Sequence, residues 1–110
     1  MNHLSKIHTA PHFEKWATVK EKIKSLYDEK NPEAVKLMEV AINDYAELLE
    51  YGGKELDKKT GESVDILLPL NGVERFDFIK SRINSHYAYI QLNELYDETR
   101  KKAARLSVMK

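Results

Sequence analysis

The stretch Asn71–Arg105, NGVERFDFIKSRINSHYAYIQLNELYDETRKKAAR, carries the two clearest helix signals of the chain. Asn71 can cap a helix through its side-chain oxygen, and Glu74 three residues later completes a capping-box pattern. Apolar residues then recur at intervals of three and four, which places them on one face of a helix. This first stripe consists of Val73, Phe76, Ile79 and Ile83.

A further helix can begin after Ser85, whose hydroxyl is a good helix cap. Acidic residues precede basic residues along it, as the helix dipole favours. Neither Pro nor Gly separates the two helices, so one helix kinked between Ile83 and His86 is an open alternative. The stripe of this helix consists of Ala88, Leu92, Leu95, Tyr96, Thr99 and Ala103.

Two more helices are predicted upstream. Pro11 suits the first turn of a helix that ends near Asp28, with Trp16 in the core. Asn31-Pro32 is typical of a new helix start, and Gly52-Gly53 is typical of its end. The apolar face of this second helix is broad, so we expect more than one neighbour to cover it, or a second copy of the chain.

Residues 1–9 are short and polar and are expected to be loose. His3, His8 and His12 suggest a metal site, but Pro11 argues against a helix that aligns His8 with His12. No Asp, Glu or Cys accompanies them before residue 14. A solvated terminus is therefore the favoured interpretation.

The connection 54–70 joins the second predicted helix to the third. Residues 54–63 are charged and rich in turn formers, and Val64–Leu70, VDILLPL, is apolar. No second β-like run exists to pair with this segment, so we expect it to lie extended across the helices and close one end of the core. The sequence thus predicts one all-α domain over residues 1–110, resembling a four-helix bundle, with a long connection between helices two and three.

Composition excludes several classes of protein. The chain has 110 residues, no Cys, and 18 Lys plus Arg against 18 Asp plus Glu. Disulfides and thiolate metal sites are excluded, and the charge balance gives no general attraction to nucleic acid or anionic membranes. No secretion signal and no membrane-spanning run is recognisable, so we expect a cytoplasmic protein.

Known catalytic spacings are missing. No Glu lies three residues before a His, as a di-metal helix bundle requires, and neither a phosphate-binding glycine loop nor a nucleophile elbow is present. We therefore predict no catalytic, cofactor-binding or metal-binding residues, and an enzyme is not favoured.

A few residues fit no packing stripe. Phe78 points away from the first stripe, and Tyr87 and Ile90 point away from the second. They are either covered by Val64–Leu70, which we favour, or exposed as a partner-binding surface. Two arginines seven residues apart could bind an acidic partner group, although pairing with local carboxylates is favoured. The candidate partner-binding residues are Arg75, Phe78, Arg82, His86, Tyr87 and Ile90.

Residues 66–105 resemble the C-terminal region of the YpoC-like proteins, an uncharacterised family of Gram-positive bacteria. The matching motifs are V-E-R-x-x-F-I from Val73, an arginine at Arg82, and H-Y-x-x-I-Q-L-x-E-L-Y from His86 to Tyr96. Family members tend to have a proline where this chain has Ile83-Asn84-Ser85, so the chain departs from the family pattern between the two helices. The resemblance implies an intracellular helical protein without established catalytic residues.

We therefore predict a binding module whose partner is another protein or a second copy of the chain, with no cofactor and no membrane partner. The alternative is a nucleic-acid accessory protein in replication or repair, since the genes of the family often lie near genes of those processes. It would use the basic C-terminal end. That end contains Arg100, Lys101, Lys102, Arg105 and Lys110.

Overall fold

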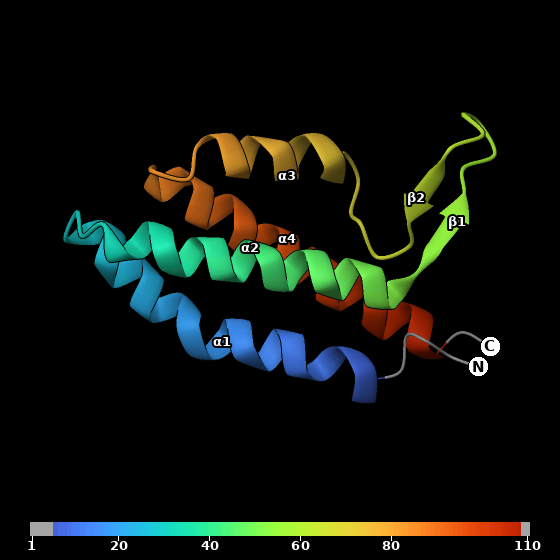
Figure 1. Ribbon diagram of the computed structural model, residues 1–110. Helices are drawn as coiled ribbons and strands as arrows, with labels where there is room; N and C mark the ends of the chain where they lie inside the picture. Colours follow the sequence, from blue (N-terminus) through green and yellow to red (C-terminus); the bar gives the residue numbers. More distant parts are fainter. Residues whose placement is uncertain (1–5, 109–110) are drawn as a thin grey trace.

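The computed structural model describes residues 6–108, which form four helices and one small β-hairpin (Figure 1). The helices are α1 (Lys6–Asp28), α2 (Glu33–Gly52), α3 (Gly72–Ser81) and α4 (His86–Val108). The strands are β1 (Lys54–Leu56) and β2 (Ser63–Asp65). The predicted all-α, bundle-like architecture with a long connection between the second and third helices is confirmed.

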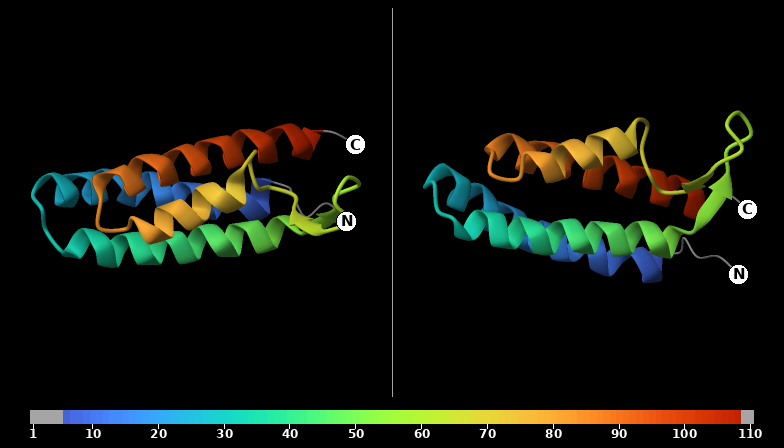
Figure 2. Two further views of the ribbon diagram at one scale, coloured as in Figure 1. Left: turned by 90° about the horizontal axis from the view of Figure 1, so that it is seen from above. Right: turned by 45° about the horizontal axis from the view of Figure 1, so that its top comes forward.

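Helix α2 carries the broad apolar face expected from the sequence. It packs against α1, α4 and β2, while α3 packs against α4 (Figures 1 and 2). Its broad apolar face is thus covered by other elements of the same chain. The width of this face therefore gives no reason to expect a second copy of the chain to bind α2. The residues of α2 that are less than 4% exposed are Ala34, Met38, Ala41, Tyr45 and Leu48.

Helix α1 begins at Lys6, so the prediction of a loose segment is wrong for residues 6–9, and residues 1–5 lie outside the described part. Pro11 lies inside the helix, where it removes one backbone hydrogen bond. Packing against α4 outweighs this loss, because Trp16 stacks on Tyr96 with ring centroids 4.7 Å apart. Trp16 is buried, as predicted.

The turn between α1 and α2 confirms Asn31-Pro32 as a helix start. The side-chain oxygen of Asn31 accepts a hydrogen bond of 2.9 Å from the Glu33 N–H. Lys30 precedes it in the left-handed backbone conformation, with φ of 57°. Glycine is the usual residue at such a position after a helix, so the lysine is an exception.

The hairpin was not predicted. β1 and β2 pair antiparallel, with Lys54 opposite Asp65 and Leu56 opposite Ser63, so the expected loop followed by an unpaired segment is wrong here. All three residues of β1 are exposed, and two are charged, so β1 lacks the apolar alternation that marks a strand. Gly61 makes the turn with φ of 74°.

The segment after the hairpin closes one end of the core, as expected. Leu67 is fully buried, and its carbonyl oxygen accepts a hydrogen bond of 3.3 Å from the Thr99 hydroxyl. Gly52 lets this segment approach α2 closely, because a Cβ at residue 52 would lie 2.5 Å from Leu67 Cγ. The hairpin and the start of α3 are thereby fixed to the bundle.

The helices α3 and α4 are separate, which answers the question of a single kinked helix. Ser85 caps α4 as predicted, since its Oγ accepts a hydrogen bond of 3.1 Å from the Tyr87 N–H. The side-chain cap predicted for Asn71 is wrong: its φ of 56° is left-handed, and its side chain makes no capping bond. The predicted stripe of α4 is entirely buried. In both views of Figure 2, α3 runs back alongside α4.

Candidate functional site

Three of the candidate residues form an exposed apolar cluster on helices α3 and α4. Phe78, Tyr87 and Ile90 are 39%, 52% and 41% exposed. The rings of Phe78 and Tyr87 meet edge to face with centroids 5.7 Å apart, and Ile90 lies one turn after Tyr87 on the same side of α4. The prediction that Val64–Leu70 covers them is wrong, because Leu67 inserts into the core instead.

Charged side chains extend this cluster along α3. The Arg82 guanidinium lies 5.7 Å from the centre of the Phe78 ring, a cation–π contact. Glu74 lies four residues before Phe78, and Arg82 lies four residues after it, so all three share one side of the helix. Both charged residues are exposed, and neither forms a salt bridge with another residue that the structure describes. We call the set of Glu74, Phe78, Arg82, Tyr87 and Ile90 the α3–α4 patch.

Arg75 does not belong to this patch, because it binds within the chain. Its two terminal nitrogens donate to the two carboxylate oxygens of Glu98 at 2.9 and 2.6 Å, and it also donates to the Leu70 carbonyl at 3.2 Å. This hydrogen bonding lowers the pKa of Glu98 and raises that of Arg75. Arg75 thus pairs with a carboxylate of its own chain, although with one 23 residues away on α4 and not with a local one, and Arg82 forms no such pair among the described residues.

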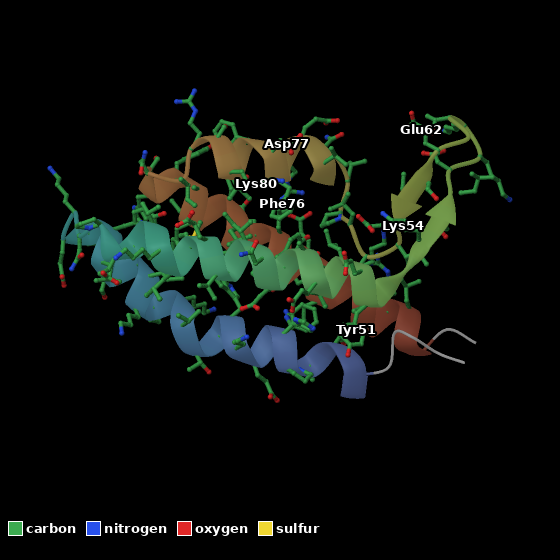
Figure 3. All side chains as sticks on the ribbon, in the orientation of Figure 1. Tyr51, Lys54, Glu62, Phe76, Asp77 and Lys80 are labelled. Carbon is green, nitrogen blue, oxygen red and sulfur yellow. The ribbon has the colours of Figure 1, made fainter. Side chains whose placement is uncertain are left out.

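The opposite side of α3 is also satisfied within the chain. Lys80 lies 4.5 Å from the centre of the Phe76 ring and forms a salt bridge of 3.7 Å with Asp77 (Figure 3). Phe76 in turn packs edge to face on Tyr45 of α2, with ring centroids 5.2 Å apart. The unpaired charges of α3 are therefore found on the side that carries Phe78.

His86 turns inward instead of joining the patch. Its ring stacks on Tyr89 at 5.6 Å between centroids and lies 6.0 Å from the ring of Tyr27. Its Nε2 is buried and has no hydrogen-bond partner among the described residues. The Tyr27 hydroxyl donates to the Ile83 carbonyl at 2.6 Å, and burial raises the pKa of Tyr27 to about 12. His86 was a candidate partner-binding residue, but its ring packs between these two tyrosines of its own chain.

The basic residues near the end of α4 are largely bound to their own chain. Arg100 and Lys101 both pair with Asp97, at 2.8 and 3.0 Å, and Lys102 donates to the Leu68 carbonyl at 3.2 Å. Arg105 is exposed, and Lys110 lies outside the described residues. Nucleic-acid binding at this end therefore stays a prediction that these contacts do not favour.

Metal binding and membrane insertion can be examined only for the described residues. Within residues 6–108, no three His, Asp or Glu side chains are grouped so that they could hold a metal ion. His3 and the side chain of His8 lie outside what the structure describes, and the His12 ring packs against Tyr51 at 5.6 Å. None of the described helices combines the length and the apolar character needed to cross a membrane.

Sequence reasoning did not find that Glu74 and Arg82 place unpaired charges of opposite sign at the two ends of the patch. The spacing of Glu74, Phe78 and Arg82 is visible in the sequence, but only the structure distinguishes the paired Arg75 from the unpaired Arg82. It also missed that the turns before α2 and α4 lie together, which no local pattern signals.

Comparison with known proteins yields a family. No curated protein and no solved structure matches the chain. A family model described as YpoC-like protein matches residues 6–110, which is wider than the C-terminal stretch on which the resemblance rested. Because this match covers nearly the whole chain, the protein belongs to the YpoC-like family.

Proposed function

We propose that this protein is a protein-interaction module, that the α3–α4 patch is its docking surface, and that its partner there is a second copy of the chain. The exposed cluster of Phe78, Tyr87 and Ile90 carries the proposal. Grouped aromatic and aliphatic side chains are unfavourable in water, and such clusters mark interaction sites. Arg82 beside Phe78 adds a side chain that is enriched in protein interfaces.

The charge pattern favours a second copy as the partner. An acid, an aromatic ring and a base follow one another at Glu74 and Phe78 of α3, about 6 Å apart along the helix axis, and at Arg82, which caps the end of α3 and lies over the Phe78 ring. A two-fold axis near Phe78 would set each Glu74 opposite the Arg82 of the other copy. The surface is thus complementary to itself, as a symmetric dimer requires.

The size of the molecule is compatible with such an interface. Its extents are 45 × 30 × 16 Å, and the helices α3 and α4 lie side by side on one face. A stable dimer buries about 800 Å² on each partner. That area includes more than the three apolar side chains, so the charged rim takes part in the contact.

Sedimentation velocity of the intact chain tests the proposal. We expect a species of twice the chain mass of 12.8 kDa that dissociates on dilution. Phe78→Ser should leave a folded monomer, whereas Val40→Ser should leave the dimer unchanged, since Val40 is an exposed apolar residue on α2, outside the patch. Circular dichroism verifies that both variants remain helical.

Two results would overturn the proposal. One is a wild-type protein that stays at 12.8 kDa up to about 1 mM, a concentration at which even weak specific dimers form. The other is a dimer that Phe78→Ser and Val40→Ser affect equally, which would place the contact elsewhere.

A further inference from the structure

A groove of about 330 Å³ lies between α2 and α3, at the end of the bundle that carries the hairpin. Helix α3 packs along α4 and comes close to α2 at few points, so the space between α2 and α3 stays open. Phe76 and Lys80 of α3 lie above α2, and Lys54 lies where the hairpin begins (Figure 3). The apolar residues that line the groove are Ala46, Leu49, Leu68, Val73 and Phe76.

The walls of this groove are fixed by contacts within the chain. The Phe76 ring meets Tyr45 of α2 edge to face, with centroids 5.2 Å apart, and so sets the spacing of the two helices. The start of α3 packs closely on the preceding segment, because a Cβ at Gly72 would collide with the Leu68 side chain. Val73 is nevertheless 58% exposed. The groove is therefore preformed, and part of its apolar surface is open to a partner.

The charged rim of the groove leaves one acid without a partner. Lys54 pairs with Asp65 at 3.0 Å. Lys80 pairs with Asp77 at 3.7 Å. Glu50 is exposed and forms no salt bridge with any other residue in the described range 6–108. With three acids against two bases, the rim has a net negative charge.

A second unpaired acid lies towards the other end of α3. Glu39 precedes Glu50 by eleven residues, or three turns, so both lie on one side of α2, about 16 Å apart. Glu39 is exposed, lies near Asn84 of the turn after α3, and has no salt bridge within the part of the chain that the structure describes. Since the ten residues of α3 span about 15 Å, the two acids bracket its length.

We propose that the groove between α2 and α3 binds a basic amphipathic helix of a partner protein. The apolar face of that helix packs on Val73 and Phe76, and two basic side chains three turns apart pair with Glu50 and Glu39. A helix laid between two helices buries its apolar face by ordinary ridge-and-groove packing, and charge complementarity selects a basic helix. The groove and the α3–α4 patch lie on opposite sides of α3, so this proposal does not depend on the dimer.

The test is an NMR titration of the uniformly ¹⁵N-labelled full chain with a synthetic peptide of roughly 14 residues, which spans α3 when helical. The peptide has leucines along one face, alanine and glutamine elsewhere, and two lysines eleven residues apart. A matched peptide has glutamate in place of both lysines. We expect saturable shifts at the amides of residues 46–50 and 73–80 with the lysine peptide, and about tenfold weaker binding of the glutamate peptide.

Variants decide whether the groove is the site. Glu50→Gln and Val73→Ser should each weaken binding of the lysine peptide by about fivefold, through loss of one exposed charge pair and of one apolar contact. Glu21→Gln removes an exposed acid on α1, outside the groove, and should leave the affinity unchanged. Phe78→Ser, on the opposite side of α3, should also bind the peptide like the wild type.

Three results would overturn the proposal. One is equal affinity for the lysine and glutamate peptides, or equal effects of Glu50→Gln and Glu21→Gln. Another is the absence of saturable binding up to about 1 mM peptide. The third is a shift of the groove amides with protein concentration alone, which would assign the groove to a second copy of the chain.

Discussion

A buried chain of hydrogen bonds joins α2, α4 and the segment after the hairpin, and Thr99→Val should break it. The Thr99 hydroxyl donates to the Leu67 carbonyl at 3.3 Å, so its only proton is used there. The Tyr45 hydroxyl, 2.7 Å away, must therefore be the donor to Thr99 Oγ1. Burial raises the pKa of Tyr45 to about 12, so this donor stays protonated at neutral pH.

The expected cost of Thr99→Val follows from burial. Valine has nearly the same shape as threonine, so no cavity forms, but the Tyr45 hydroxyl and the Leu67 carbonyl both lose their partner. All three residues are fully buried. A buried group without a hydrogen bond costs about 1–3 kcal/mol, and the Leu67 bond is long. We expect the free energy of unfolding to fall by about 2–3 kcal/mol, a large share of the total for a domain of this size.

Urea unfolding followed by circular dichroism measures this change. Tyr45→Phe alone should cost about 1 kcal/mol, and the double variant should cost less than the sum of the two by about 1 kcal/mol, because the residues share a bond. Thr18→Val is the control, since the Thr18 hydroxyl is exposed on α1. A loss below about 0.5 kcal/mol for Thr99→Val, or strictly additive variants, would refute the reasoning.

Three further predictions concern local contacts. Gly52→Ala should lower the free energy of unfolding by about 1–2 kcal/mol, because the alanine Cβ would collide with the buried Leu67. This cost exceeds the gain from the better helix propensity of alanine, and a urea midpoint at or above that of the wild type would contradict it. Lys30→Gly should raise the free energy of unfolding by about 0.5–1 kcal/mol, because glycine relieves the left-handed backbone strain; an unchanged or lower urea midpoint would refute this. The bond with Arg75 lowers the pKa of Glu98 below its ordinary value of 4.5, so this pair stabilises the fold fully above pH 4.5 and loses its effect as the pH falls from there through the lowered pKa of the folded state. The excess of wild type over Glu98→Gln should thus be about 0.5–1 kcal/mol at pH 7 and smaller at pH 3, and a difference independent of pH would show that the pair contributes nothing.

The helices could be predicted from the sequence because apolar residues recur at helical intervals along them, although Val73 of the stripe predicted for α3 is exposed. Ile79, Leu92 and Ala103 were assigned to the core from spacing alone, and all are buried. The hairpin could not be predicted, because all three residues of β1 are exposed and lack the apolar alternation that marks a strand. Its position depends on the tertiary contact between Leu67 and Gly52.

The candidate site was predicted in part. Phe78, Tyr87 and Ile90 stood out because they fit no stripe, but whether Val64–Leu70 would cover them depended on where Leu67 inserts. The position of Leu67 is determined by packing between residues that are far apart in the sequence. The roles of the two arginines could not be separated either, because Glu98 is 23 residues from Arg75.

Mixing two charge-reversal variants tests the self-complementary patch most directly. Arg82→Glu and Glu74→Arg should each sediment as monomers, because each would place like charges opposite one another across the two-fold axis. An equimolar mixture restores both attractive pairs and should sediment as a heterodimer of twice 12.8 kDa. A mixture that stays monomeric, or single variants that dimerise like the wild type, would contradict the proposed interface.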